Sequence, residues 1–148
     1  MEKTEKTIRI KYHTDAIERL AYIGGKSDWI DLRAAQEVRM KAGDFTMIDL
    51  GVSVELPPGY EMIIAARSST FKNFGLIQTN AIGVVDESYN SDEDHLRWPC
   101  YATRDTTVHV NDRICQFRII EHQPQIVFEE VETLGNRPRG GFGSTGIA

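Results

Sequence analysis

Cysteine and long hydrophobic runs are scarce in this chain of 148 residues. Cys100 and Cys115 are its two cysteines, too few for a disulfide framework at this length. A reducing, cytoplasmic location is the simpler expectation, with both thiols buried as small hydrophobic groups. No apolar run approaches the roughly 18 residues that span a bilayer, and the opening MEKTEKT is too polar for a signal peptide. The sequence thus predicts no membrane partner.

Positive charge is also in short supply. The chain has 17 lysines and arginines against 22 aspartates and glutamates, so its net charge is −5 and its pI is about 5.4. Broad nucleic-acid binding favours a basic face, so we expect no nucleic-acid partner. A polyphosphate ligand is compatible with this charge if local arginines and a metal ion neutralise it. The 4 histidines lack the spacing of a zinc site.

Helical patterns are nearly absent, and short β-type segments separated by turn residues predominate. The run 60–66 is the most apolar of them and suits a buried strand. Segments 76–79 and 83–85 are expected to pair as a hairpin, and 111–112 marks a tight turn. Only 68–74 has a helical pattern, so we predict an all-β sandwich or barrel with one short helical segment. The other expected strands are 8–12, 45–50, 51–56, 98–103, 106–110, 114–120 and 125–131.

The final run, 135–148, reads GNRPRGGFGSTGIA and is too rich in glycine to bury a core or to order cheaply. One interpretation is a disordered terminus. The other is a phosphate-binding arm, because the run combines arginines, hydroxyl groups, open backbone N–H groups and one aromatic ring. We therefore divide the chain into a β domain, 1–132, and a flexible C-terminal arm, 133–148.

Polar clusters interrupt the strand pattern where turns are expected. Arg67-Ser68-Ser69 follows the apolar run 60–66. A helix that begins there would place Ser68 or Ser69 at its N-cap, with free N–H groups that suit a phosphate. The alternative is an ordinary cap beside a solvated arginine.

A second cluster contains Asp86 and Tyr89. The apolar segment 83–85 would carry Asp86 into a partly dry site, where its carboxylate suits a general base toward water. The alternative is an aspartate that forms a turn. Tyr89 either packs flat against a sugar or belongs to the core or an interface.

Two more clusters lie at 31–35 and 112–116. Asp112-Arg113 is typical of a turn with a surface charge. Gln116 shares a strand face with Ile114, where the pattern would accept an apolar residue. A buried amide must find partners, which favours a contact with a ligand or water.

These clusters, in this order, resemble the five motifs of the trimeric dUTPases, the deoxyuridine triphosphate diphosphatases. The resemblance extends from Asp31 to Gly146, and five motifs in register are far more specific than one. The matching segments are DLRAA at 31–35, RSS at 67–69, GVVDESY at 83–89, DRICQ at 112–116 and RGGFGSTG at 139–146.

The resemblance implies a jelly-roll-like β fold and a homotrimer whose sites draw on more than one subunit, with the C-terminal arm closing over a site. It implies hydrolysis of dUTP to dUMP and pyrophosphate by water attack on the α-phosphorus, assisted by Mg²⁺. Such an activity limits uracil in DNA and supplies dUMP for dTMP synthesis. Mg²⁺ would offset much of the triphosphate charge, so a negatively charged protein is tolerable.

The resemblance also assigns roles to residues. Asp86 would activate the attacking water, and Gln116 would contact that water or a phosphate. Tyr89 would lie beneath the deoxyribose, and Asn80 and Gly83 belong to the segment that reads uracil. Further substrate contacts are implied for Arg67, Ser68, Ser69, Arg113, Arg137, Arg139, Phe142, Gly143, Ser144 and Thr145, and an indirect metal contact through water for Asp31.

Within the arm, the resemblance makes Phe142 the cap on the uracil ring. Ser144 and Thr145 would bind the outer phosphates together with either Arg137 or Arg139. The family's arginine commonly lies five residues before the phenylalanine, which is Arg137 here. Pro138 follows it, and spacing alone does not decide between the two.

The segment 91–98 departs from the family pattern and looks like an added acidic loop, which either shapes the rim of the site or is simply solvated. The dCTP deaminases share an Arg-Ser-Ser motif, but they need a glutamate base and a different third motif, so 83–89 and the tail favour the diphosphatase. A non-catalytic binding protein on the same fold is the other alternative. If the gene is carried by a phage, a regulatory protein partner is a further expectation.

Overall fold

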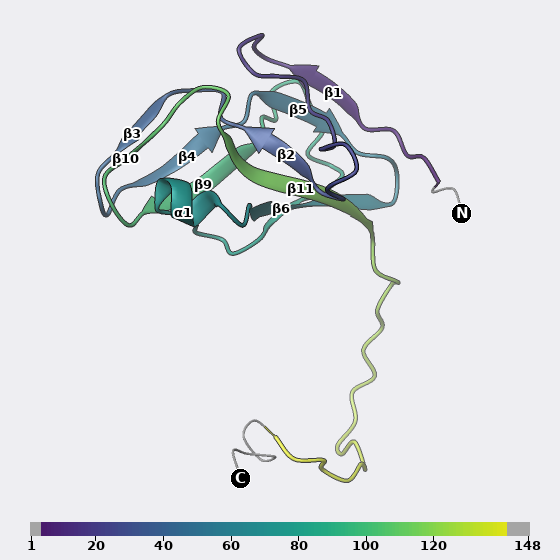
Figure 1. Ribbon diagram of the computed structural model, residues 1–148. Coiled ribbons are helices and arrows are strands. Elements are labelled where there is room, and N and C mark those ends of the chain that lie inside the picture. Colours follow the sequence, from purple (N-terminus) through teal and green to yellow (C-terminus); the bar gives the residue numbers. More distant parts are fainter. Residues whose placement is uncertain (1–3, 142–148) are drawn as a thin grey trace.

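The computed structural model describes residues 4–141, which form eleven strands and one short helix (Figure 1). The helix, α1, is Thr70–Phe74, within the predicted helical segment. The strands are β1 Arg9–Tyr12, β2 Ile30–Arg33, β3 Val38–Met40, β4 Phe45–Asp49, β5 Val52–Glu55, β6 Tyr60–Ala66, β7 Leu76–Gln78, β8 Gly83–Val85, β9 Arg97–Ala102, β10 Thr106–Val108 and β11 Arg113–Glu121.

Antiparallel pairs arrange these strands in small sheets. The largest has the order β2-β11-β6-β8, and the second has the order β4-β9-β7. Two-stranded sheets, β1-β5 and β10-β3, complete the described body. β6 coincides with the predicted run 60–66 and lies between β11 and β8, where Met62 and Ile64 are buried.

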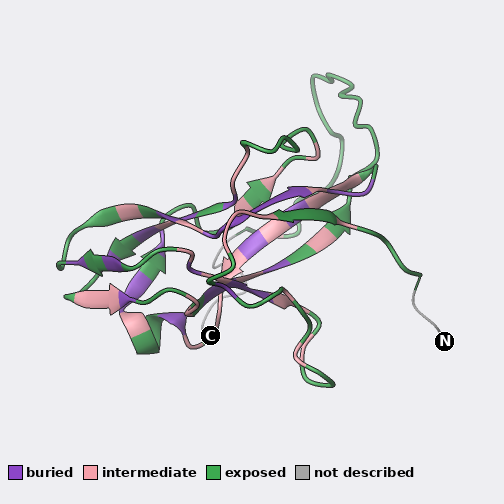
Figure 2. Cartoon of the chain, turned by 90° about the horizontal axis from the view of Figure 1, so that it is seen from above, coloured by how far each residue is buried: buried purple, intermediate pink, exposed green. Residues whose placement is uncertain are grey.

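The core is built on strand alternation. In β9, Trp98, Cys100 and Ala102 are buried while Arg97 and Tyr101 are exposed, so one face packs inward. Figure 2 shows the buried residues along the strands that face the interior. Each large apolar side chain buried in this way contributes about 1.5–3 kcal/mol, which makes the all-β core the main source of stability.

Both cysteines are free and buried, as predicted. Burial raises the pKa of the Cys100 thiol to about 12, so this thiol is not a reactive thiolate at neutral pH. No helix within residues 4–141 is long and apolar enough to span a bilayer.

The predicted hairpin between 76–79 and 83–85 is wrong. β7 pairs with β9, whereas β8 pairs with β6 in the other sheet. The connection passes through Ala81, whose φ of 59° turns the chain from one sheet to the next. The apolar pattern identified both strands, but it does not specify partners. The tight turn at Asn111, with φ of 78°, is confirmed, although β10 and β11 also lie in different sheets.

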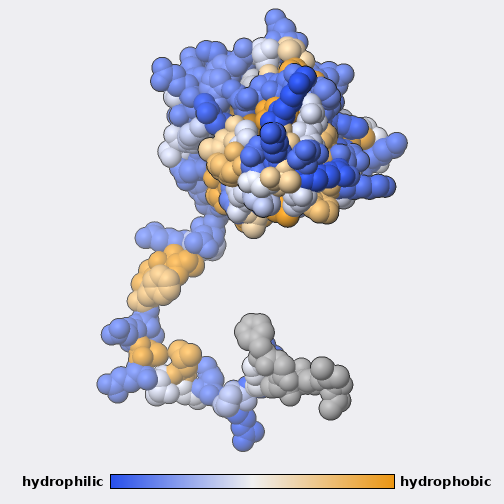
Figure 3. Space-filling model, turned by 90° about the vertical axis from the view of Figure 1, so that its left-hand side faces the viewer, coloured by the Kyte–Doolittle hydropathy of each residue, from blue (hydrophilic) through white to orange (hydrophobic). Residues whose placement is uncertain are grey.

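The predicted strand at 125–131 is also wrong. No strand follows β11 in the described residues, and the chain runs away from the body as an extended segment (Figures 1 and 3). Val127 is 84% exposed and Phe128 is 92% exposed. Their side chains fit the strand pattern, but no strand among residues 4–141 pairs with this segment.

β2 was missed because 31–35 was interpreted as a turn, and β3 was not predicted either. Asp31 instead lies inside β2, with Leu32 buried beside it, and pairs with β11. The charged residues at positions 31 and 33 mask the apolar alternation of the strand. Their side-chain partners come from distant parts of the chain, so the local pattern does not reveal them.

Candidate active site

Asp31 is the centre of the first group of predicted site residues. It is only 8% exposed, and its carboxylate accepts hydrogen bonds from Arg67 Nε at 2.9 Å and Arg113 Nη1 at 3.4 Å. β11 lies between β2 and β6, so Arg113 on β11 and Arg67 just after β6 both reach Asp31. A buried carboxylate needs such partners. The arrangement holds two guanidinium groups near one another, which suits an anionic ligand.

Thr70, which the sequence analysis did not select, fastens the turn before α1 to β11. Its buried hydroxyl accepts from Arg67 N at 2.9 Å and donates to Ile114 O at 2.9 Å. Ser69 is the N-cap, as one alternative predicted, but its side chain makes no capping bond and instead accepts from Arg67 Nη1 at 3.2 Å. Ser68 is exposed beside it. The position of Thr70 directly after the Arg-Ser-Ser motif is the sequence feature that could have identified it.

Gln116 lies half-buried on β11, opposite Asp31 of β2. Its Nε2 donates to Ala66 O at 3.1 Å. The Gln116 amide, which was expected to need a partner among apolar residues, therefore has a backbone carbonyl as its partner. It lies beside the turn that carries Arg67. We call Asp31, Arg67, Ser69, Arg113 and Gln116 the arginine cluster.

The second group surrounds a pocket of about 410 Å³ at the end of β8. Asp86, Ser88 and Tyr89 line it together with apolar side chains that include Ile64. The Tyr89 hydroxyl donates to His95 O at 2.7 Å, which holds the ring at the edge of this pocket. We call it the Asp86 pocket.

Asp86 itself is exposed in this chain, so the predicted partly dry setting is wrong. β8 is the edge strand of its sheet, so no further strand of the described chain shields the loop that follows it. Both the hydroxyl and the backbone N–H of Ser88 donate to Asp86 Oδ2, the latter at 2.8 Å. These hydrogen bonds, the hydroxyl first, lower the pKa of Asp86 below its usual value. The carboxylate is therefore ionised at neutral pH, the state that a general base requires.

Asn80 and Gly83 lie between β7 and β8. Asn80 is exposed, and its Oδ1 accepts from Gln78 Nε2 at 2.9 Å. A Cβ added at Gly83 would lie 3.2 Å from Ile64 Cβ and 3.6 Å from Asn80 Nδ2. Glycine therefore keeps β8 close to β6 and leaves room beside the Asn80 amide. Gln78 was not selected from the sequence, although a glutamine at a buried strand position is a detectable signal.

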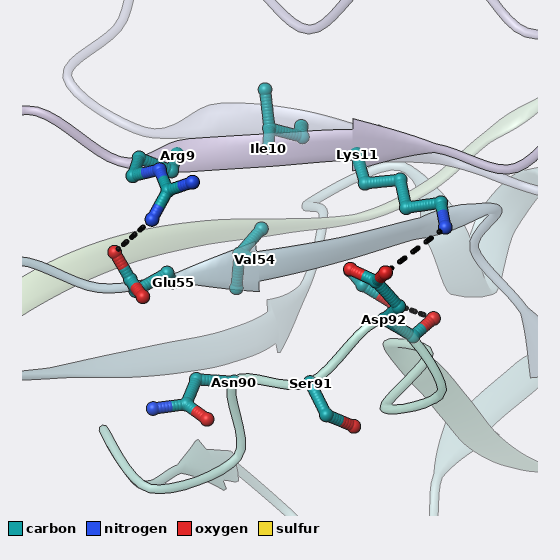
Figure 4. Close-up of a pocket in the computed structure, with 9 residues that line it drawn as sticks. Arg9, Ile10, Lys11, Val54, Glu55, Asn90, Ser91 and Asp92 are labelled. Atoms are coloured by element: carbon teal, nitrogen blue, oxygen red, sulfur yellow. Dashed lines mark hydrogen bonds and ion pairs between the residues drawn. The ribbon is translucent and has the colours of Figure 1, made fainter.

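Residues of the acidic loop, 91–98, line the rim of the Asp86 pocket, which favours the first of the two expectations for it. His95 and Leu96 line the Asp86 pocket, and the His95 ring stacks on His13 with centroids 3.7 Å apart. On its outer side, Asp92 forms an ion pair with Lys11 of β1 at 3.4 Å (Figure 4). The loop is thus anchored to the β1-β5 sheet.

The described residues do not bring all predicted site residues together. Within residues 4–141, the lining of the Asp86 pocket includes none of the arginine cluster. Arg137 and Arg139 are exposed on the segment that leaves the body after β11. The four arm residues Phe142, Gly143, Ser144 and Thr145 lie outside the described residues.

No three His, Cys, Asp or Glu side chains within residues 4–141 are grouped to hold a metal ion. Asp31 has its two oxygens engaged by two arginines, one by Arg67 and the other by Arg113. The two guanidinium charges beside this carboxylate repel a further cation, which disfavours direct metal ligation by Asp31.

Solved dUTPases share this fold. The crystal structure of dUTPase from Streptococcus mutans matches with a TM-score of 0.72, covering 80% of this chain and 98% of that chain at 19% identity. The dUTPase of Staphylococcus bacteriophage 80alpha matches with a TM-score of 0.75, covering 88% and 99% at 15% identity. The expected all-β fold with one short helix is confirmed.

The dUTPase family model matches residues 6–146. The SPbeta prophage-derived deoxyuridine 5'-triphosphate nucleotidohydrolase YosS of Bacillus subtilis is 52% identical over 139 residues, which cover 94% of this chain and 97% of YosS. The deoxyuridine 5'-triphosphate nucleotidohydrolase of Neorickettsia sennetsu is 33% identical over 150 residues, with 99% of each covered. The chain belongs to the dUTPase family, as its five motifs indicated.

Proposed function

We propose that this protein hydrolyses dUTP to dUMP and pyrophosphate. The observation that carries the proposal is the Asp86 pocket, which combines an ionised carboxylate with Tyr89 at its edge in a member of the dUTPase family. The 52% identity to YosS, a deoxyuridine 5'-triphosphate nucleotidohydrolase, supports the same substrate. Removal of dUTP would limit uracil in DNA and supply dUMP for dTMP synthesis.

Asp86 acts as the general base. Ser88 occupies its Oδ2 with two donors, which orients the carboxylate and leaves Oδ1 to accept a proton from water. Attack on the α-phosphorus then needs that water in line with the leaving pyrophosphate. Gln116 contacts the water or a phosphate, and Tyr89 packs beneath the deoxyribose.

The arginine cluster neutralises the phosphate chain. Arg67 and Arg113 share one carboxylate, which balances only one of their two positive charges. The remaining positive charge is available to an anion at their outer edges. Ser68 and Ser69 add hydroxyl donors at the start of α1. The remaining contacts come from the arm, 133–148, through Phe142, Gly143, Ser144, Thr145 and either Arg137 or Arg139.

A homotrimer completes the site. The arginine cluster and the Asp86 pocket are separate within one chain, so the proposed chemistry needs groups from a second copy. The exposed Val127 and Phe128 on the extended segment support contact between copies, because burying them against another subunit is favourable. The described body then serves as the β domain, 1–132, and the residues after it as the arm that closes over a neighbouring site.

Mg²⁺ fits this arrangement as an ion held chiefly by the substrate phosphates. Asp31 lies between the two arginines proposed to bind phosphate, and their charges favour an indirect contact of Asp31 with the ion, through water. A dUTPase from phage phi11 of S. aureus coordinates a structural Mg(II) ion. When bound, the ion offsets the negative charge that develops on the leaving pyrophosphate.

A regulatory partner is proposed on separate grounds. YosS is prophage-derived, and phage dUTPases of Staphylococcus bacteriophage 80alpha are described as controlling transfer of virulence genes. The acidic loop, 91–98, provides exposed charge for such a contact. A cytoplasmic location agrees with two free, buried cysteines.

Pyrophosphate release from dUTP, dCTP, dTTP and UTP, measured in parallel with and without Mg²⁺, tests the proposed function. We expect efficient release from dUTP alone and a marked dependence on Mg²⁺. Ammonia release from dCTP would instead identify a deaminase. Absence of turnover with all four nucleotides would contradict the proposal.

A further inference from the structure

Gln78 is a buried amide whose every hydrogen-bonding partner can be identified. It lies at the end of β7 and is 7% exposed. Its Oε1 accepts from the indole Nε1 of Trp98 at 2.7 Å, and its Nε2 donates to Ile64 O at 3.0 Å and to Asn80 Oδ1 at 2.9 Å. Three strands thus meet through one side chain, since Trp98 belongs to β9 and Ile64 to β6.

The direction of these hydrogen bonds is fixed by chemistry. An indole N–H can only donate, so the oxygen of Gln78 must face Trp98. A backbone carbonyl can only accept, so the NH₂ group of Gln78 must face Ile64. Turning the Gln78 amide around would break both hydrogen bonds inside the core, where unpaired polar groups are costly.

The fixed direction of the Gln78 amide also fixes the orientation of the Asn80 amide. Because the Gln78 NH₂ group points at it, Asn80 must offer its oxygen to Gln78 and direct its own NH₂ group elsewhere. That NH₂ group lies beside Gly83, on the exposed side of the turn between β7 and β8. Asn80 is therefore held as a hydrogen-bond donor toward a ligand.

We propose that Gln78 and Trp98 are positioning residues that make this site select uracil over cytosine, an inference that rests on the proposed function. Uracil has a carbonyl oxygen at the position where cytosine has an amino group. A donor at Asn80 complements the carbonyl and opposes the amino group, whereas a freely rotating amide would accept either base. Two hydrogen bonds of Gln78 in the core thus fix the orientation of Asn80, and the orientation of Asn80 determines which base is preferred.

The variant Gln78→Met tests the proposal, because it keeps the size of the side chain and removes its amide. We expect the KM for dUTP to rise about tenfold while kcat changes little, since loss of one neutral hydrogen bond weakens binding by about that factor. The Ki of dCTP as a competitor should not rise in parallel. The ratio of dCTP Ki to dUTP KM should therefore fall about tenfold. Trp98→Phe should lower the same ratio, because a smaller aromatic ring remains while the N–H donor that orients Gln78 is lost.

Val108→Ala is the matched control for stability, since it opens a cavity in the β10-β3 part of the core. At a comparable loss of thermal stability it should leave the ratio unchanged. An unchanged ratio in Gln78→Met, or equal losses for both nucleotides, would overturn the proposal. If the natural protein fails to hydrolyse dUTP, the proposed function is wrong. The role of Gln78 is then judged by calorimetric binding of dUMP and dCMP, and equal effects on the two would refute it.

Discussion

Arg67 Nε donates to Asp31 Oδ1 at 2.9 Å, joining β2 to the turn after β6 across 36 residues of sequence. The carboxylate is nearly buried and Arg113 shares it, so its removal leaves two arginines without their partner.

We expect Asp31→Asn to lower the free energy of unfolding by about 1–3 kcal/mol, the usual loss when hydrogen bonds to a charged group are weakened. Urea denaturation measures it. Asp28→Asn is the control, because its ion pair with Arg118 at 2.6 Å is half-exposed and should contribute less than about 1 kcal/mol. Equal effects for the two variants would contradict the structural role of Asp31.

Asp86→Asn should reduce the rate of dUTP hydrolysis by about 10²–10⁴-fold, because an amide cannot take the proton of the attacking water. Binding of dUTP should be largely kept. Single-turnover kinetics and calorimetric binding distinguish the two effects. Asp15→Asn, at another exposed acid, should leave both unchanged. Loss of binding without loss of chemistry in Asp86→Asn would refute the base assignment.

Ser88→Ala should shift the pH dependence of kcat/KM. The Ser88 hydroxyl lowers the pKa of Asp86, so its removal raises that pKa toward the ordinary value. Activity that needs the ionised carboxylate is lost as pH falls through this pKa, and the acid limb of the profile should therefore move to higher pH. An acid limb that stays in place would show that another group controls it.

Stability should fall in mild acid because of His13. Burial first, and then the charges of His95 and Lys11, lower the pKa of His13 below its ordinary 6.5, opposed by Asp49 and Asp92. Below about pH 6.5 the unfolded chain therefore binds protons more readily than the folded chain, and stability declines toward the lower folded pKa.

His13→Gln should reduce that decline, as thermal unfolding between pH 5 and pH 8 would reveal. His109→Gln is the control, since His109 is largely exposed beside Glu37. The same pH dependence in the natural protein and in His13→Gln would exclude this histidine as the cause.

Deletion of 137–148 should leave the body folded and nearly abolish turnover. The described residues after β11 are largely exposed and add little to the core. Circular dichroism and sedimentation check folding and assembly, and pyrophosphate release checks activity. Arg137→Ala and Arg139→Ala, compared singly, identify the arginine that binds the outer phosphates. Unchanged turnover in the deletion would remove the arm from the mechanism.

Local patterns predicted local structure well. The apolar run 60–66 coincides with β6, and the motif Arg67-Ser68-Ser69 does precede a helix with Ser69 at its N-cap. The third family motif predicted Asp86 and Tyr89 as site residues, and both line the Asp86 pocket. Asp31 was misplaced in a turn because its arginine partners are remote in sequence.

Features that depend on partners could not be predicted from the pattern. The segments 76–79 and 83–85 have strand character, yet nothing in either specifies β9 or β6 as its neighbour. Gln78 was not selected because its proposed role depends on the donor and acceptor directions of three hydrogen bonds, which the sequence does not show. Asp86 was expected in a partly dry setting. It is exposed because it follows an edge strand, where only a neighbouring chain could cover it.

The exposed Val127 and Phe128 also bear on how this protein is made and stored. A newly synthesised chain carries this apolar run in open water, where it is prone to stick to other unfinished chains. In the proposed homotrimer another subunit would cover these side chains, so successful production would depend on assembly being faster than aggregation. Dilution that separates the subunits of the proposed homotrimer should expose these side chains again and leave the extended segment open to proteolysis.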